Sequence, residues 1–342
     1  MATTAQSHLH DSSQATPEPL RKVLHDQLLH RRKRLDSMLS VQETPRLVSL
    51  LKQVDAALDR VATGSWGICE LCHDHIDDDQ LLIDPLARFC LMHLPPAQME
   101  VLQQDLELAS RIQARLLPRR DYECDGWNAA FHYRPLGPVS GDYCDLVDGP
   151  DGSLYFILGD VSGKGVAASM LMTNLSAMFR TLIPVGVVLP QIVERVNRVF
   201  CESTLPMQFA TIVCGKASAD GTLELCNAGH NSALICGVGN VSTIESSSLP
   251  LGLFPDAPFS STTLKLQPGQ SLILCTDGIS EAESPAGEEF GVKRLSDAIR
   301  SSHLDCSAKL VVACLDHLEH FRSGSPSFDD ETLLILQRTA EA

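Results

Sequence analysis

Short apolar runs follow one another after Pro118, and this pattern constrains the fold more than any other feature of the chain. Runs bounded by turn residues are typical of β-strands, and strands that succeed each other directly favour antiparallel pairing. The expected strands are WNAAFHYR, DYCDLV, SLYFILGDV, FATIVCGKA, TLELCNAG, SALICGV, QSLILCTDG and ETLLILQR. Helical runs occur between only some of them. Residues 119–340 are therefore predicted to form an α+β domain in which sheets pack together and helices cover the outer faces.

The residues before this domain have a helical pattern. Residues 1–18 are polar and are expected to be disordered. Residues 19–62 carry apolar residues at helical spacing in two stretches, and Thr44 and Pro45 suit the start of the second helix. The two helices are predicted either to form an antiparallel hairpin or to pair between subunits.

A third helix is expected over residues 95–118, as a linker between the N-terminal part and the strands. Its apolar stripe keeps a heptad register through Met99, Leu102, Leu106, Ala109 and Leu116, with Gln113 at one seam position. The stripe favours a homodimer seam, in which a polar residue would fix the register. The alternative is a helix packed on the domain that follows.

Residues 63–94 form a cysteine-rich module. It contains Cys69-x2-Cys72 and Cys90-x2-His93, with 17 residues between the two pairs. Two such pairs suit one tetrahedral zinc ion with a closed, structural set of four ligands. His73 and His75 are substitute ligands at a less natural spacing. Without metal, the same pattern would be three buried cysteines and a surface histidine.

The composition limits the classes of function. The net charge of −16 argues against a nucleic-acid-binding or anionic-membrane surface. The N-terminus has no apolar segment of signal-peptide length, and the longest apolar runs are too short to span a bilayer, so a cytoplasmic protein is expected. Cysteines in apolar strand-like runs, such as Cys214 and Cys226, are then expected in the core.

The glycine-rich stretch GDVSGKG begins at Gly159 and does not match a phosphate-binding P-loop. Three residues separate Gly159 from Gly163 where a P-loop needs four, and Lys164 is followed by glycine instead of serine or threonine. This argues against a nucleotide-binding kinase. The informative residue is Asp160, a carboxylate at the end of an apolar strand.

Four aspartates share this setting: Asp142, Asp160, Asp277 and Asp329. Each adjoins an apolar strand, and none has an obvious basic partner nearby in the sequence. Buried carboxylates need a compensating charge, and a pair of Mg²⁺ or Mn²⁺ ions supplies it because hard cations prefer oxygen ligands. The alternative for any one of these aspartates is a turn cap.

Six segments occur in a specific order: VSGDYCD, GDVSGKGVAASMLM, NAGHNSALI, LPLGL, LCTDGISEAESPAGEEFG and DDETLLIL. In this order they resemble the metal-dependent (PPM-type) serine/threonine phosphatases, in the bacterial branch similar to SpoIIE and RsbU, over roughly residues 95–340. The resemblance implies a β-sandwich flanked by helices, with two Mn²⁺ or Mg²⁺ ions at one end that activate water. It also implies a phosphorylated STAS-domain anti-anti-sigma factor as substrate, in a partner-switching pathway.

The resemblance assigns the metal ligands. They are Asp142, Asp160, the main-chain carbonyl of Val161, Asp277 and Asp329. Asp160 resembles the carboxylate shared by both metals, and Asp142 would complete one of the two sites. Asp277 and Asp329 would hold the other metal. Asp329 is preferred to Asp330 because the first aspartate of the closing motif is the usual ligand.

Five other positions bear on activity. Lys164 and His230 are candidates to neutralise phosphate or to protonate the leaving group, and the alternative for them is a turn lysine and a structural histidine. Ser140 stands where glycine is common and Cys144 where an aromatic residue is common, and both are expected to be tolerated. Glu331 replaces an apolar residue beside the last metal ligand, and it is expected to alter the surroundings of the metal or its affinity.

The cysteine-rich module resembles the DksA/TraR-type zinc finger from ALDRVATGSWGICELC to RFCLMH, with His93 where cysteine is more common. The preferred interpretation is a cytoplasmic protein phosphatase that is regulated by this module through the linker helix of a homodimer. The competing interpretation is a degenerate phosphatase that acts as a zinc-finger binding module on transcription machinery.

Overall fold

The computed structural model describes residues 18–40, 44–119, 121–205, 207–237, 240–301 and 306–339. The expected tail, apart from residue 18, lies outside the described residues. The chain divides into an N-terminal unit (Met1–Gln104) and a C-terminal unit (Asp105–Ala342), and the division falls inside helix α4 (Pro96–Ala114). Each unit is described by itself.

Two helices of the N-terminal unit, α1 (Glu18–Leu39) and α2 (Pro45–Thr63), pack against each other. Thr44 caps α2, because its Oγ1 accepts a hydrogen bond from the Leu47 amide at 3.3 Å. Gly64 ends the helix in the left-handed conformation. The buried residues between the helices are Leu28, Leu35, Val54 and Ala57. The helices therefore pair within the chain, which is the first of the two expected arrangements.

The rest of the N-terminal unit contains a short helix, α3 (Asp78–Ile83), and a 3₁₀ turn, η1 (Leu91–His93). The Trp66 indole N–H donates to the Pro85 carbonyl at 3.0 Å, which ties the two ends of the cysteine-rich segment together. A second small core comprises Leu24, Trp66, Cys69, Ile76, Leu81 and Ala87. A module of this size has little apolar core, so a bound metal would add substantially to its stability.

The C-terminal unit is built on two antiparallel sheets. One has six strands in the order β1-β2-β11-β10-β7-β8, and the other has five in the order β3-β4-β5-β6-β9. The strands are β1 (Asp121–Cys124), β2 (Trp127–Arg134), β3 (Asp142–Asp148), β4 (Leu154–Val161), β5 (Ala210–Ala217), β6 (Thr222–Ala228), β7 (Ala233–Gly237), β8 (Asn240–Ile244), β9 (Thr262–Lys265), β10 (Ser271–Cys275) and β11 (Glu331–Arg338).

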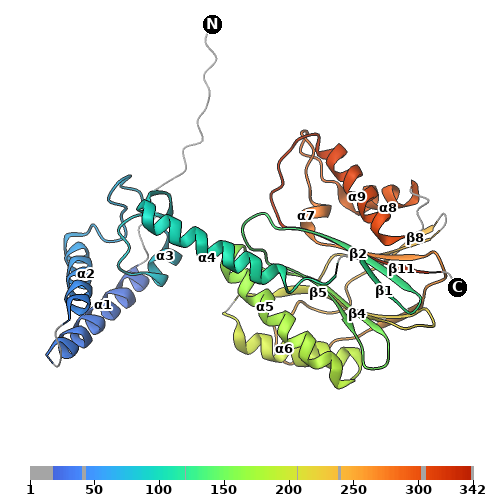
Figure 1. Ribbon diagram of the computed structural model, residues 1–342, viewed down its shortest axis with the longest axis horizontal. Helices are drawn as coiled ribbons and strands as arrows, with labels where there is room; N and C mark the ends of the chain where they lie inside the picture. Colours follow the sequence, from blue (N-terminus) through green and yellow to red (C-terminus); the bar gives the residue numbers. More distant parts are fainter. Residues whose placement is uncertain are drawn as a thin grey trace, which may run out of the picture. The chain divides into compact units, whose positions relative to one another are not determined.

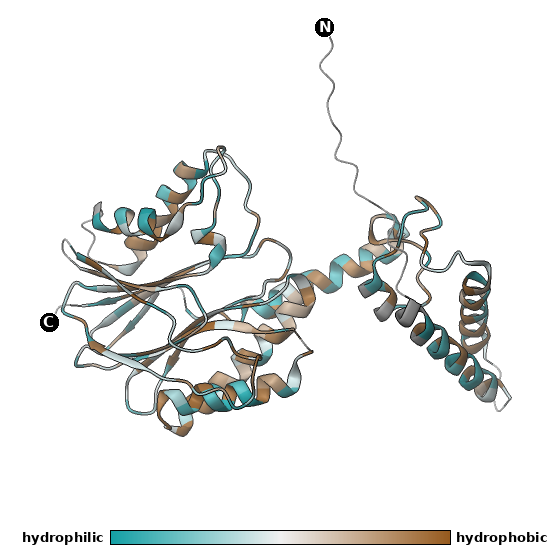
Figure 2. Cartoon of the chain, turned by 180° about the vertical axis from the view of Figure 1, so that it is seen from behind, coloured by the Kyte–Doolittle hydropathy of each residue, from teal (hydrophilic) through white to brown (hydrophobic). Residues whose placement is uncertain are grey.

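Helices cover the outer face of each sheet in this unit (Figure 1). The five-stranded sheet carries α5 (Gly165–Leu182), the 3₁₀ turn η2 (Ile183–Val185) and α6 (Leu189–Ser203), and the six-stranded sheet carries α8 (Gly291–Ser301) and α9 (Ser307–Arg322). Hydrophobic and hydrophilic segments alternate along α5 and α6 in Figure 2, as expected for helices with one buried face.

Apolar side chains fill all three interfaces between these layers. The core between the sheets includes Trp127, Phe156, Leu158, Leu272 and Leu334. A second core lies under α5 and α6, and a third lies under α8 and α9. The predicted fold class is therefore confirmed: the unit is α+β, with two packed antiparallel sheets flanked by helices.

Helix α5 departs from one expectation. With the turn that follows, Gly165–Val185 is long and apolar enough to cross a membrane by length and composition alone, whereas every apolar run was expected to be too short. However, Met172, Leu175 and Phe179 of this helix are fully buried in the core that it shares with the five-stranded sheet. Packing within the unit therefore accounts for the apolar character of α5.

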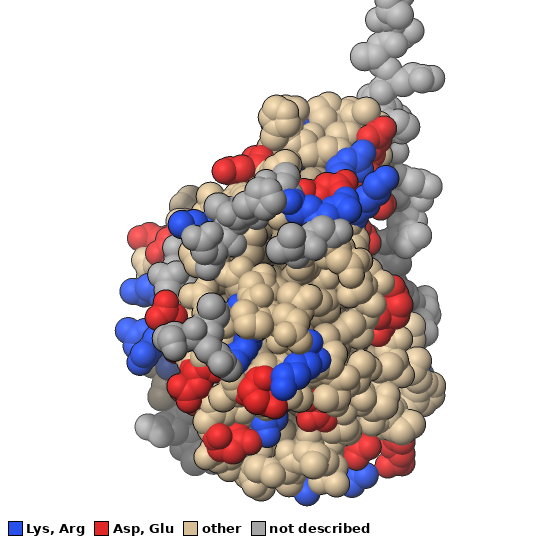
Figure 3. All heavy atoms as spheres, turned by 90° about the vertical axis from the view of Figure 1, so that its right-hand side faces the viewer, with Lys and Arg blue, Asp and Glu red and all other residues tan. Residues whose placement is uncertain are grey.

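Charged side chains of both signs are interspersed on the face of the molecule shown in Figure 3. Ion pairs at the surface of the C-terminal unit include Lys216 with Asp151 at 2.6 Å and Arg294 with Glu288 at 3.0 Å. Exposed pairs of this kind contribute little to stability. The buried charges described below are of more consequence.

Candidate functional site

Antiparallel pairing brings the strand-end aspartates to one end of the two sheets. Asp142 opens β3 and lies opposite Asp160 near the end of β4. In the other sheet, Asp277 follows β10 and begins the short helix α7 (Asp277–Ser280), while Asp329 lies two residues before β11. Because β10 and β11 are neighbouring antiparallel strands, the end of one and the start of the other lie at the same edge.

Two threonines join the sheets at this edge. The Thr276 hydroxyl donates to Asp142 Oδ2 at 2.9 Å, and the Thr332 hydroxyl donates to the same oxygen. The Thr332 amide donates to Thr276 Oγ1 at 3.0 Å. Asp142 of the five-stranded sheet is thus held by β11 and by the end of β10. Neither threonine was predicted from the sequence, although each stands within three residues of an assigned aspartate.

Burial and mutual repulsion raise the pKa values of the clustered carboxylates. Burial, followed by repulsion from Asp277, Asp329 and Asp330, raises the pKa of Asp160 to about 7. Burial and repulsion from Asp329 raise the pKa of Asp277. Burial also raises the pKa of Asp142 well above its ordinary range, with a further contribution from Asp160. The cluster is therefore short of positive charge, which a bound cation would supply.

Asp142 provides the observation that tests whether these residues fit a metal. Its side chain is 1% exposed, and its Oδ1 has no hydrogen-bond partner among the described residues. A buried carboxylate oxygen without a partner is costly, and a hard divalent cation satisfies it. The donor set, which consists of oxygens only, also suits Mg²⁺ or Mn²⁺.

The two consecutive aspartates before β11 have different surroundings. Asp330 is 8% exposed, and its two carboxylate oxygens accept the amides of Leu136 at 2.7 Å and Gly141 at 3.0 Å. The Asp329 side chain is 39% exposed, and its Oδ2 lies 2.7 Å from Lys164 Nζ. Asp330 is engaged in holding main chain, whereas Asp329 faces a lysine ammonium group that a metal can replace. These contacts favour Asp329 as the ligand.

Lys164 and His230 differ in what they can do. Lys164 Nζ reaches both Asp329 and the Phe328 carbonyl, the latter at 2.8 Å, so its positive charge lies at the carboxylate cluster. His230 is 6% exposed, and its Nδ1 lies 2.8 Å from Thr211 Oγ1. Burial lowers the pKa of His230 to about 4, so the ring is neutral at neutral pH and suits a structural role better than proton donation.

Gln113 was expected at a seam position between two copies of the linker helix, and the structure shows contacts within the chain instead. Its side chain is 5% exposed, donates to the Ser140 carbonyl at 2.7 Å and accepts from the Ser140 amide at 3.0 Å. Ser140 Oγ in turn accepts from the Asp142 amide at 3.0 Å. Gln113 therefore packs into the C-terminal unit and holds the segment that leads to Asp142. At this end of α4 the alternative interpretation, a helix packed on the following domain, is the one observed.

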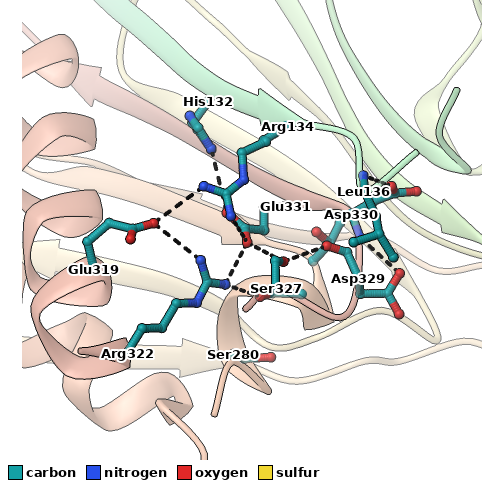
Figure 4. Close-up of polar contacts among 12 residues, drawn as sticks. His132, Arg134, Leu136, Ser280, Glu319, Arg322, Ser327, Asp329, Asp330 and Glu331 are labelled. Carbon is teal, nitrogen blue, oxygen red and sulfur yellow. Dashed lines mark hydrogen bonds and ion pairs between the residues drawn. The ribbon is translucent and has the colours of Figure 1, made fainter. Parts of the chain in front are cut away.

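Glu331 was expected to alter the surroundings of the metal. Its side chain instead contacts two arginines and a serine. It is 1% exposed, and its Oε1 lies 2.6 Å from Arg322 Nη2, 3.1 Å from Arg134 Nη2 and 2.5 Å from Ser327 Oγ. Figure 4 shows these side chains converging on Glu331. Arg322 was not predicted from the sequence, because α9 carries no motif that marks it.

A cleft of about 330 Å³ lies beside the assigned carboxylates, and Asp277, Glu281, Arg322, Phe328 and Asp329 are among its lining residues. The Phe328 side chain at its rim is 63% exposed. The cleft gives a ligand direct access to Asp277 and Asp329.

The N-terminal unit contains a second candidate metal site. Ligand atoms of Cys69, Cys72, Cys90 and His93 all lie within 4.8 Å of one another. Burial opposes ionisation of the Cys69 thiol, but the main-chain amides around it outweigh burial and lower its pKa to about 6. Three sulfur ligands and an imidazole suit tetrahedral zinc. Neither His73 nor His75 belongs to this group of four.

Comparison with known proteins agrees with the arrangement of the C-terminal unit. The family described as Stage II sporulation protein E (SpoIIE) matches residues 150–339. Protein IcfG of Synechocystis sp. is 28% identical over 267 residues, which cover 68% of this chain and 41% of IcfG. Phosphoserine phosphatase RsbU of Bacillus subtilis is 24% identical over 246 residues, which cover 70% of this chain and 72% of RsbU. This chain therefore spans less than half the length of IcfG.

A solved structure is also similar. The crystal structure of the RsbU and RsbW domains of Rv1364c from Mycobacterium tuberculosis matches with a TM-score of 0.54 and 27% identity, over 64% of this chain and 62% of that one. The family match covers more than half of this chain and includes Asp160, Asp277 and Asp329. The chain belongs to the SpoIIE family of PPM-type serine phosphatases.

Proposed function

We propose that this chain hydrolyses phosphoserine or phosphothreonine in a protein substrate, with two Mn²⁺ or Mg²⁺ ions at the strand-end carboxylates. The observation that carries the proposal is the buried Oδ1 of Asp142, which has no hydrogen-bond partner among the described residues. The neighbouring carboxylates of Asp160, Asp277 and Asp329 repel one another, and bound cations would compensate this repulsion. When bound, such a pair of ions supplies an activated water and compensates the charge of the phosphate.

The residues of the chain have distinct parts in this proposal. Asp160 would be shared by both ions, and Val161 would offer its main-chain carbonyl. Asp142 would complete one site, and Asp277 and Asp329 would hold the other ion. Thr276 and Thr332 hold Asp142 Oδ2, which leaves Oδ1 available as a ligand. Lys164 contributes positive charge where the phosphate would arrive. The reaction requires no covalent intermediate on the protein.

The proposed substrate is a phosphorylated STAS-domain anti-anti-sigma factor in a cytoplasmic partner-switching pathway. Two similarities support it: RsbU is named a phosphoserine phosphatase, and the similar Rv1364c structure combines RsbU and RsbW domains. Glu281 and Glu283 line the cleft and are not assigned as metal ligands, so their negative charge favours a substrate segment with basic character.

The proposed regulator is the cysteine-rich module, as a DksA/TraR-type finger at residues 63–94 with one structural zinc. It follows a helical hairpin at residues 19–62 and is joined to the phosphatase domain, residues 119–340, by the helix at residues 95–118. The cluster of three cysteines and one histidine supports the zinc. Leu102 and other exposed apolar residues of α4 support a homodimer through this helix.

Release of phosphate from a purified phosphorylated STAS-domain protein tests the proposal. We expect hydrolysis that requires Mn²⁺ or Mg²⁺, and its loss in Asp277→Asn because that variant removes one ligand. Val185→Ala, which changes a surface-exposed residue of η2, is a control that should keep full activity. Wild-type turnover by Asp277→Asn would contradict the assignment. An inactive wild type that still binds transcription machinery would favour the degenerate phosphatase.

A further inference from the structure

Glu331 is the centre of a buried ionic cluster that the proposed mechanism does not use. Its Oε1 accepts from Arg322 of α9, from Arg134 of β2 and from Ser327 in the loop before β11. Arg322 is itself only 2% exposed. Glu319, with a side chain that is 59% exposed, lies against both arginines at the surface end of the cluster (Figure 4).

Two members of this cluster also touch the main chain beside the assigned metal ligands. Arg322 Nη2 donates to the Gly278 carbonyl at 3.3 Å, and Gly278 follows Asp277. Ser327 Oγ lies 3.0 Å from the Asp329 carbonyl. A serine hydroxyl has a single proton, so Ser327 shares it between this carbonyl and Glu331. Both segments that present carboxylates to the proposed metals are therefore linked to one buried glutamate.

The two segments are also in direct contact. A Cβ added at Gly278 would lie 2.0 Å from the Asp330 carbonyl oxygen, so the start of α7 packs on the main chain before β11 with no room for a side chain. A shift of either segment therefore displaces the other. The separation between Asp277 and Asp329 therefore depends on the contact between Gly278 and the main chain of Asp330. The ionic cluster around Glu331 fixes this contact from the side of α9.

We infer that Glu331 and Arg322 are positioning residues that set the geometry of Asp277 and Asp329 for metal binding. The inference rests on the proposed function, because it concerns the same metal site. Arg322 is suited to this role because its planar guanidinium bonds Glu331 and the Gly278 carbonyl from one nitrogen while a second nitrogen contacts Glu319. A lysine has the same charge but cannot hold this geometry.

Metal affinity and stability can be separated by the choice of variants. Glu331→Gln and Arg322→Lys disturb the cluster singly. The double variant Arg322→Met/Glu331→Leu removes both buried charges, and an apolar pair in place of a buried ion pair often restores stability. Arg338→Met is the matched control, since Arg338 is also a buried arginine, 4% exposed, at the opposite end of β11, where it donates to the Gly126 carbonyl.

The measurements are the dissociation constant for Mn²⁺ by calorimetry, on the full chain with its cysteine cluster loaded with zinc, and the melting temperature. We expect Glu331→Gln and Arg322→Lys to weaken Mn²⁺ binding about tenfold or more, as for other residues that orient metal ligands. The double variant should melt near the wild type and still bind Mn²⁺ more weakly. Arg338→Met should melt lower and bind Mn²⁺ as the wild type does.

The inference is overturned if Glu331→Gln and the double variant bind Mn²⁺ with wild-type affinity while the wild type binds normally. Glu331→Gln keeps the test decisive if the double variant does not fold, because it retains the volume and one hydrogen-bonding group of glutamate. A wild type that binds no Mn²⁺ would overturn the proposed function, and the inference with it. The two failures are therefore distinguishable.

Discussion

The stability of the metal-free protein is predicted to fall as the pH rises, because folding buries Asp160 and places it among other carboxylates. Its pKa is about 7 in the folded protein, against an ordinary value of 3.8. At a pH below both values, Asp160 is protonated in the folded and the unfolded protein and does not change the free energy of unfolding. Between them only the unfolded chain releases the proton, so unfolding becomes more favourable with each step in pH, and the loss is complete above about 7.

The magnitude follows from the two pKa values. A difference of about 3 pKa units corresponds to about 4 kcal/mol, and the range from pH 5 to pH 8 covers about two of these units, or about 3 kcal/mol. An asparagine side chain cannot ionise, so the variant Asp160→Asn should lose about 3 kcal/mol less than the wild type over this range. It should also be the more stable protein at pH 8 without Mn²⁺ or Mg²⁺.

Urea unfolding of both proteins from pH 5 to pH 8, in buffer without Mn²⁺ or Mg²⁺, measures this difference. The comparison removes the contributions of titrating groups that do not interact with Asp160, because the two proteins share them. Added Mn²⁺ should stabilise the wild type at pH 8 and leave Asp160→Asn unchanged. Parallel stability profiles for the two proteins would refute the reasoning, because they would show that burial and the neighbouring carboxylates do not raise the pKa of Asp160.

Three further predictions concern other parts of the chain. Elemental analysis should find about one zinc per subunit in the wild type and much less in Cys69→Ser, and equal zinc in both would contradict the ligand assignment. Asp330→Asn should lower stability by about 1–3 kcal/mol in thermal unfolding, since it disturbs two buried main-chain hydrogen bonds. Asp329→Asn should mainly weaken Mn²⁺ binding. The reverse pattern would show that the two aspartates have exchanged roles. Leu102→Glu with Leu106→Glu should give a monomer by mass measurement in solution and a changed activity, and a variant that stays dimeric with unchanged activity would rule out the linker model.

The strand-end aspartates show what could be predicted from the sequence. Apolar runs with turn residues locate the strands, and consecutive strands favour antiparallel pairs. A carboxylate at the start of one strand therefore meets a carboxylate at the end of the next. Asp142 lies opposite Asp160 for this reason. The ordered motifs then distinguish the two-sheet arrangement from other α+β folds.

The contacts that the sequence analysis missed join residues far apart in the chain. Gln113 pairs with Ser140, and Glu331 pairs with Arg134 almost two hundred residues earlier. Heptad spacing placed Gln113 on the apolar side of a helix, but spacing does not say whether that side meets a second copy or the same chain. A motif likewise shows that the residue at position 331 is unusual, but it does not show which residues its side chain contacts.

The central claim, a pair of metals held by strand-end carboxylates, is tested most directly by a crystal structure of the protein soaked in Mn²⁺ and measured for anomalous scattering. The account predicts two Mn²⁺ peaks about 3.5–4 Å apart, with Asp160 between them, Asp142 on one ion and Asp277 and Asp329 on the other. Fully occupied Mn²⁺ peaks elsewhere, with none at these aspartates, would contradict it.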